Sequence, residues 1–302
     1  MESSQEKSIA QTTKKNWHDK YYKILLIIPL ILLVFSFIYI LNFHSKNGDF
    51  FYKDISLTGG TSVTIYSQID SLKIKQDLQD KLGEIHIREI YDLLTNEKKA
   101  IVIETISDGE TTKEILEEYL GYELTDENSS FEFTGSSLSK SFYNQLLLSI
   151  LLAFILMGIT VFIIFRIFVP SVAVILSAFA DILMTLVVVD IIGIKISSAG
   201  IVAFLMLIGY SVDTDILLTM RVLRRDDGTF NEKSLGALKT GLTMTLTALF
   251  SLLAALFVVK SFSNVLTQIL TILSIGLVFD ILNTWVTNLS ILKWYFEKKK
   301  NV

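Results

Sequence analysis

The sequence predicts an α-helical integral membrane protein with six transmembrane helices and one small α+β domain outside the membrane. Apolar residues fill 51% of the 302 positions and the mean hydropathy is +0.52, above the balance of a soluble domain. Six apolar runs approach the ~20 residues that a helix needs to cross ~30 Å of hydrocarbon. A hydrophilic segment separates the first run from the other five. The expected spans are 24–43, 146–165, 168–189, 197–220, 242–259 and 266–289.

Positive charges gather at one side of the predicted spans, and this distribution predicts the orientation. The positive-inside rule places residues 1–23 and the basic tail 293–302 in the cytoplasm, with the five later helices inside 146–292. No small-residue cleavage site follows the first run, so we expect it to be retained as a helix. The flanking residues on the basic side are Lys14, Lys15, Lys20, Lys23, Arg166, Arg224, Arg225, Lys233, Lys239, Lys293 and Lys298 to Lys300, whereas the short loops opposite hold Lys195 and Lys260.

The hydrophilic segment 44–145 is then extracytoplasmic and has a folding pattern of its own. It carries 10 lysines and arginines against 19 acidic residues, a net charge of about −9. Alternating and helical periodicities follow one another in the order β-α-β-β-α-β, with a threonine cap on the second helix. That order is typical of the ferredoxin-like split βαβ arrangement. The expected elements are 61–66, 69–82, 84–94, 99–106, 111–120 and 130–134.

Several kinds of chemistry have no support in the sequence. There are no cysteines, which excludes disulfides, thiolate catalysis and thiolate-bound metals. The three histidines, His18, His44 and His86, lie outside the spans without paired metal spacing. No glycine-rich phosphate loop is present, so any ATP hydrolysis would belong to a partner. We therefore expect no enzyme activity, no catalytic residue, no metal, no cofactor and no nucleic acid.

The fourth run contains two carboxylates, and a charge in hydrocarbon costs several kcal/mol unless it is paired, hydrated or protonated. They are Asp213 and Asp215, in the stretch Gly-Tyr-Ser-Val-Asp-Thr-Asp that begins with Gly209 and Tyr210. On a helix they are about 200° apart, so one would face the bundle interior and the other a crevice or a partner subunit. Ser211 shares a face with Asp215 and is its expected hydroxyl partner. The pair indicates ion or proton handling, or a polar contact between helices.

Two further carboxylates fall inside predicted spans. Asp181 lies in the third and Asp280 in the sixth, and each could relay protons or pair with Lys239, Asn283, Thr243 or a partner's side chain. Arg221 stands at a helix end, where snorkelling and the helix dipole account for it. The small and hydroxylated residues 240–245 favour close helix packing.

The order of one span, one small external domain and five clustered spans resembles the SecD/SecF family, within the resistance-nodulation-division superfamily. Leu57-Thr58-Gly59-Gly60-Thr61 and the stretch 209–213 carry the resemblance, which points to the SecF branch because SecD has a longer external domain. The sequence at 217–223 is similar to that of archaeal members of the family. The resemblance implies a protein-export subunit of the cytoplasmic membrane. Its partners would be a SecD-type subunit in a pseudo-symmetric twelve-span unit, the Sec channel, a translocating polypeptide and the lipid bilayer, with the proton motive force as the energy source.

The resemblance also ranks the candidate residues. The aspartate of this motif in bacterial SecF corresponds to Thr214, whereas the aspartate of the SecD motif corresponds to Asp213. Asp213 is therefore the leading proton-site candidate, and Asp215 is expected to be an interface acid. Lys239 stands where bacterial SecF has an arginine. Gly59 and Gly60 most simply permit a tight turn into the first strand. In the bacterial family members an acidic residue lies closer to the two glycines than Asp54 does here, so we assign Asp54 no role.

Other functions explain less of the sequence. A scaffold that stabilises the export channel without transducing energy stays open. An intramembrane aspartyl protease could use two aspartates as a dyad, but its Gly-x-Gly-Asp segment is absent and the external domain would be unexplained. A self-sufficient efflux pump of the superfamily would have twelve spans and two large external loops.

Overall fold

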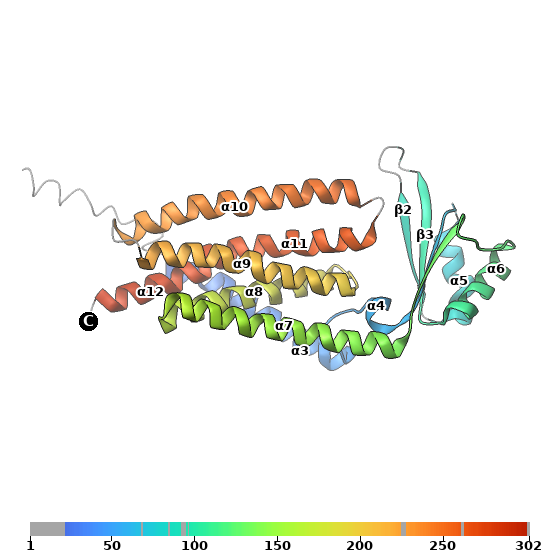
Figure 1. Ribbon diagram of the computed structural model, residues 1–302, viewed down its shortest axis with the longest axis horizontal. Coiled ribbons are helices and arrows are strands. Elements are labelled where there is room, and N and C mark those ends of the chain that lie inside the picture. Colours follow the sequence, from blue (N-terminus) through green and yellow to red (C-terminus); the bar gives the residue numbers. More distant parts are fainter. Residues whose placement is uncertain are drawn as a thin grey trace, which may run out of the picture.

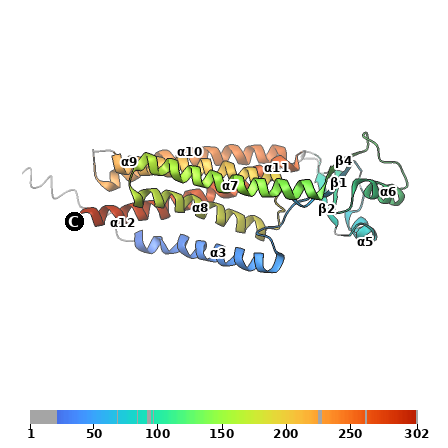
Figure 2. The same ribbon diagram turned by 60° about the horizontal axis from the view of Figure 1, so that its bottom comes forward.

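A computed structural model describes residues 22–67, 69–83, 85–91, 95, 97–224, 228–260 and 263–300. The described chain forms a long bundle of helices with a small sheet domain at one end (Figure 1). Six of the described helices are long and apolar enough to cross a membrane, as predicted. A view turned by 60° shows the same division, with the bundle helices running lengthwise beside one another (Figure 2).

The bundle has an interior and a periphery. Just over half of the spanning windows of α8 and α9 is buried, at 56% each, against 6% for α10, so α8 and α9 form the interior. The last span is a single long helix that passes through a π-helical segment, η1. The bounds are α3 Ile27–Asn47, α7 Ser136–Phe165, α8 Phe168–Ile191, α9 Ser198–Arg224, α10 Phe230–Val259, α11 Asn264–Leu282, η1 Asn283–Asn288 and α12 Leu289–Lys300.

Helix α10 begins well before the predicted span, and a local signal explains this. The Thr229 hydroxyl accepts from the backbone N–H of Glu232, whose carboxylate accepts from the backbone N–H of Thr229, which is a capping box. The cap starts a helix in residues too polar for the hydropathy pattern to show. Lys233 and Lys239, expected in a loop, therefore lie on α10.

The domain outside the bundle follows the predicted order of elements, preceded by one short extra helix. Its four strands form an antiparallel sheet in the order β2-β3-β1-β4. Asp108, rather than a threonine, caps α6, and Thr111 donates to it through its backbone N–H at 3.0 Å. The bounds are α4 Ile55–Thr58, β1 Gly60–Ile65, α5 Ser71–Leu82, β2 Ile85–Tyr91, β3 Lys98–Thr105, α6 Gly109–Leu120 and β4 Ser129–Thr134; residues 84 and 92–94 of the predicted second strand lie outside the described residues.

Both helices of this domain pack on one face of the sheet, because alternate strand residues share one core with them. Val63 of β1 pairs with Ile103 of β3, and both side chains are fully buried. They pack with Ile74 and Leu78 of α5 and Leu116 of α6. Because side chains alternate between the two faces along each strand, the apolar side chains face the helices.

The opposite face of the sheet turns toward the bundle and holds a buried carboxylate. Glu104 of β3 is only 3% exposed and accepts from the guanidinium of Arg88 on β2. Burial raises the pKa of Glu104, the Arg88 charge opposes that rise, and Asp54 and Lys195 from the bundle side also act on it. The sheet therefore sits against the polar end of the bundle with its charged face inward (Figure 1).

A carboxylate on the other, helix-facing side of the sheet is half-buried, and its pKa shifts in the opposite direction. Glu89 of β2 pairs with Lys98 of β3 and accepts from the Tyr91 hydroxyl. These hydrogen bonds, that of Lys98 first, lower the pKa of Glu89 to about 2.

Candidate functional site

Three carboxylates from three different helices meet inside the bundle. Asp181 lies midway along α8, Asp215 in the second half of α9 and Asp280 near the end of α11, and all three are fully buried. Asp181 lies within electrostatic range of both Asp215 and Asp280. We call these three residues the carboxylate cluster.

Asp181 joins three elements through its two oxygens. The Ser211 hydroxyl on α9 donates to Oδ2 at 2.5 Å, and the Asn283 amide on η1 donates to Oδ1 at 2.7 Å. The Thr287 hydroxyl donates to Oδ1 of Asn283 at 3.0 Å, which fixes the orientation of that amide. Asp181 is therefore held by a connected polar network rather than by a cation.

Asp215 and Asp280 each accept one hydrogen bond from the last span. The Asn288 amide donates to Oδ1 of Asp215 at 2.8 Å, and the Thr284 hydroxyl donates to Oδ1 of Asp280 at 3.2 Å. Each of these donors is neutral. Hydroxyl and amide donors offset only part of the cost of a buried negative charge.

The π-helical segment η1 makes this arrangement possible. In a π-helix the hydrogen bonds run from residue i to i+5, so residues five apart lie nearly in line. Asn283 and Asn288 are five apart, and both are fully buried against the carboxylate cluster. In a regular α-helix they would face different directions, and one of the two amides would be lost to the cluster.

Buried acceptors outnumber the available donors at the cluster. Within the described residues, Oδ2 of Asp215, Oδ2 of Asp280 and Oδ1 of Asn288 have no hydrogen-bond partner. The indole N–H of Trp285, on the π-helical segment η1, also lacks a partner among the described residues. An unsatisfied buried polar group costs about 1–3 kcal/mol. A proton on one carboxylate turns an acceptor into a donor, so the cluster has the chemistry to hold an exchangeable proton.

Small residues let the surrounding helices close over the cluster. A Cβ added at Gly241 on α10 would lie 2.4 Å from Cζ2 of Trp285 and 3.3 Å from Cγ2 of Thr214. A Cβ at Gly276 on α11 would lie 2.4 Å from a methyl carbon of Leu207. The expected close packing of residues 240–245 is thus visible at Gly241.

The two carboxylates of the fourth span face opposite directions, as their spacing predicts. Asp215 belongs to the cluster, whereas Asp213 is exposed on the outside of the bundle beside Tyr210, which is 42% exposed. Asp213, the leading candidate from the sequence, is thus exposed, whereas the other three acids are buried. The prediction that Ser211 partners Asp215 is wrong, because its hydroxyl binds Asp181. Gly209 on this helix has open space around it.

The predicted basic residues lie away from the cluster. Lys239 is exposed on α10, and the Thr243 hydroxyl donates to its carbonyl at 2.7 Å rather than to a carboxylate. Arg221 is half-buried and donates to the carbonyl of Gly236, which ties α9 to α10. Of the residues proposed as partners for Asp181 and Asp280, Asn283 is hydrogen-bonded to Asp181.

A backbone clamp connects the cluster helices to the sheet domain. The linker after α3 pairs with the loop before α9: the N–H of Ile196 donates to the carbonyl of Tyr52 at 2.7 Å, and the N–H of Asp54 donates to the carbonyl of Ile196 at 3.0 Å. The N–H of Ser198, the first residue of α9, donates to the Ser56 hydroxyl at 3.0 Å. Residues 52–56 and 196–198 form this linker clamp.

The glycine pair follows the clamp and leads directly into β1. Gly59 has φ +86° and Gly60 has φ +140°, a range that side chains disfavour. A Cβ at Gly60 would lie 2.3 Å from the carbonyl oxygen of Thr105 on β3. Asp54, to which the sequence assigned no role, caps α4 by accepting from the N–H of Ser56 at 3.1 Å.

Several residues around the cluster could not be predicted from the sequence. Ser177, Thr219, Thr284 and Asn288 are buried around it. The available signal was the run Asn-Thr-Trp-Val-Thr-Asn at 283–288, whose polar residues are unusual in the last turns of the predicted apolar span 266–289.

Comparisons with known proteins point to one family. Residues 115–298 match the family described as protein export membrane protein SecD/SecF, C-terminal. The SecF proteins of Methanothermobacter thermautotrophicus and Methanocaldococcus jannaschii are each 40% identical, over 92% of this chain and 94% and 97% of theirs. The crystal structure of SecDF, a translocon-associated membrane protein from Thermus thermophilus, has the same fold with a TM-score of 0.73 at 20% identity. That match covers 92% of this chain and 38% of the SecDF chain.

Proposed function

This chain belongs to the SecD/SecF family of protein-export membrane proteins, and from that premise we propose that it is a SecF-type subunit that couples the proton motive force to polypeptide translocation. It is a multi-pass protein of the cell membrane that serves the Sec pathway. In the proposal it pairs with a SecD-type subunit and acts at the Sec channel on an emerging polypeptide. The single observation that carries the energetic part is the carboxylate cluster.

The cluster supports proton coupling through its electrostatics. Three carboxylates share one buried interior, where amides and hydroxyls, all neutral, donate to them. Three negative charges there would repel one another as well as lose their hydration. A proton shared within the cluster relieves both costs and satisfies one of the unpaired acceptors. Loading and releasing that proton would favour two different packings of α8, α9 and the last span.

The linker clamp supplies a path from the cluster to the external domain. Asp215 lies on α9, and the first residue of that helix is hydrogen-bonded to the linker that leads into β1. A shift of α9 along its axis would therefore be transmitted through the linker clamp and the glycine pair to the sheet domain. We propose that this βαββαβ domain is ferredoxin-like, lies outside the cytoplasm and moves against the polypeptide.

The exposed faces of α9 and α10 are the proposed surfaces for the SecD-type partner. The face of α9 carries Asp213, and that of α10 carries Lys239 and the hydroxyls of Thr243, Thr247 and Ser251. A carboxylate facing lipid is costly, so a protein neighbour is the better match for Asp213. Hydroxylated residues such as those of α10 are common at contacts between membrane helices. The basic ends of the helices place both termini in the cytoplasm in this proposal.

The test is gradient-driven export by the full complex with its SecD-type partner, assayed in vesicles with and without a protonophore. Asp215→Asn, Asp181→Asn and Asp280→Asn are expected to abolish the gradient-dependent part of export while the amount of complex in the membrane stays normal. Asp213→Asn is the matched control on the same helix, and it should retain the gradient-dependent part. Full gradient dependence in all three cluster variants would refute the proposal.

A scaffold role is the second candidate, since a connected network of amides and hydroxyls is also what a structural contact between helices uses. The same assay separates the two. If deletion of the chain blocks export while every asparagine variant is normal, the scaffold role is correct and proton coupling is wrong.

A further inference from the structure

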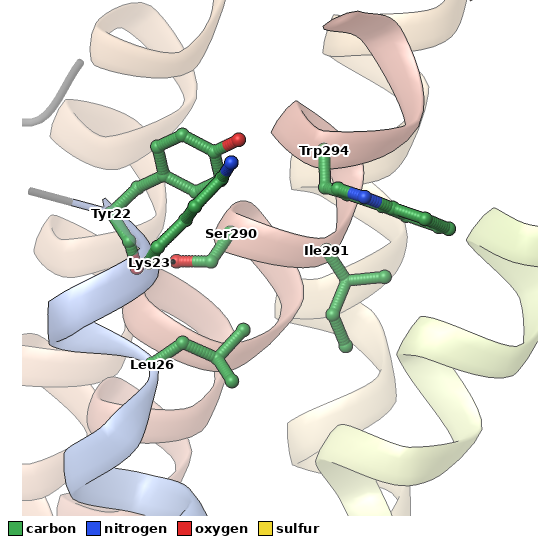
Figure 3. A pocket seen from close by; sticks show the side chains of 6 residues that line it. All are labelled: Tyr22, Lys23, Leu26, Ser290, Ile291 and Trp294. Carbon is green, nitrogen blue, oxygen red and sulfur yellow. Dashed lines mark hydrogen bonds between the residues drawn. The ribbon is translucent and has the colours of Figure 1, made fainter. Parts of the chain in front are cut away.

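A cavity at the basic end of the bundle has no part in the proposed function. It has a volume of about 330 Å³ and lies between the start of the first span and α12. Figure 3 shows Tyr22, Lys23 and Leu26 from the first span on one side and Ser290, Ile291 and Trp294 from α12 on the other. We propose that this cavity binds one anionic lipid of the adjoining leaflet, with its phosphate at the lysines and one hydrocarbon chain along the apolar wall.

The walls change from polar to apolar with depth, as a lipid does. Along the first span, Lys23 stands at the outer end and Leu26 lies about 4.5 Å deeper, at 1.5 Å of rise per residue. Along α12, which runs outward, Ile291 lies deeper than Trp294 by the same rise. The apolar wall then continues inward from Leu26 to Leu30, one turn further on and 49% exposed. A free phosphate would leave this lower wall uncovered, whereas a hydrocarbon chain covers it.

The charges around the outer end favour a phosphate. Lys23 is exposed at the rim, the Lys293 ammonium lies 4.9 Å from the centre of the Tyr22 ring, and the Lys298 ammonium lies 5.4 Å from that of Trp294. Glu297 is the opposing charge, and its carboxylate is engaged by the Tyr22 hydroxyl at 2.5 Å. Lys293 is only 4% exposed, so the charges that reach the rim are Lys23, Lys298 and Glu297, which leave it net positive. Basic pockets between helices at this membrane depth are suited to anionic headgroups.

The two walls are held at a fixed separation, so the cavity is formed in advance. The Ser290 hydroxyl donates to the Tyr22 carbonyl at 3.3 Å, and the Tyr22 hydroxyl spans the gap to Glu297. Trp294 lines the cavity and is 46% exposed. Tryptophan and tyrosine are the side chains that prefer the level of lipid headgroups.

The experiment weighs the intact protein after extraction from membranes that contain phosphatidylglycerol and phosphatidylcholine. Native mass spectrometry should show one retained phosphatidylglycerol on the unmodified chain. Lys23→Gln and Lys298→Gln should each lower that retention about five-fold, and the double variant about twenty-five-fold. Lys113→Gln on α6, which removes the same charge far from the cavity, should leave it unchanged. Trp294→Leu should lower retention of both lipids, because it changes the wall and not the charge.

Three outcomes would overturn the proposal. Equal retention of phosphatidylglycerol by the double variant and the unmodified chain would show that the lipid binds elsewhere. Equal retention of phosphatidylcholine would show that the lysines do not select charge. Displacement of the lipid by millimolar inorganic phosphate would show a free-anion site instead. Because none of these variants touches the carboxylate cluster, failure here leaves the proposed function standing.

Discussion

Gly60 is the residue whose replacement the structure constrains most sharply. An alanine Cβ there would lie 2.3 Å from the backbone carbonyl oxygen of Thr105, and the backbone φ of +140° already disfavours a side chain. The backbone term costs about 1–2 kcal/mol, and overlap with a fixed backbone atom adds about 1–3 kcal/mol. Gly121 at the end of α6 is a matched control, because its φ of +75° imposes a comparable backbone term while nothing lies within 4 Å of its added Cβ.

The assay is hydrogen exchange of the full-length protein, followed by mass spectrometry of peptides from β1 and β3. Gly60→Ala should lower the protection of these strands about 5- to 150-fold more than Gly121→Ala lowers that of α6, since each 1.4 kcal/mol is a factor of ten. The same variant should weaken export, because the glycine pair joins the linker clamp to the sheet. Equal loss of protection in the two variants would refute the argument from the Thr105 contact.

Three further predictions concern other contacts. Arg88→Ala should destabilise the sheet by ~2 kcal/mol in exchange experiments, because it leaves the buried Glu104 without its guanidinium, and adding Glu104→Gln should recover part of the loss. The pKa of Glu89 is lower in the folded than in the unfolded protein, so its contribution to stability is present above pH 4.5 and is lost as the pH falls toward about 2. Protection of β2 from hydrogen exchange should fall over that pH range in the unmodified chain but not in Glu89→Gln. Gly241→Val should lower the thermal stability of the purified protein by ~1–3 kcal/mol, whereas Gly209→Val on an open helix face should change it little.

Hydropathy and periodicity predicted most of the fold from the sequence. The six spans and the order of strands and helices follow from runs of apolar residues and from periods of 2 and 3.6, which burial imposes directly. The start of α10 did not follow, because a capping box at Thr229 begins a helix in polar sequence. A capping box and an apolar run are separate signals, so a cap can begin a helix before the apolar run starts.

Only part of the carboxylate cluster could be predicted from the sequence. The sequence named Asp181, Asp215 and Asp280 as unusual, but which of the acids meet depends on how the helices rotate against one another. Helical spacing predicts that Asp213 and Asp215 diverge, and it does not say which one faces inward. The π-helical turn that turns Asn288 to the interior has no simple sequence signature, so a partner of Asp215 was missed.

The proposed exchangeable proton resides in the buried cluster and not at Asp213. Infrared difference spectroscopy of the full-length protein in lipid vesicles, recorded while the pH is changed, reports protonated carboxyl groups directly. We expect a protonated-carboxyl band that is lost or shifted in Asp215→Asn and unchanged in Asp213→Asn. A band that disappears only in Asp213→Asn, or no such band in the unmodified protein at neutral pH, would contradict it.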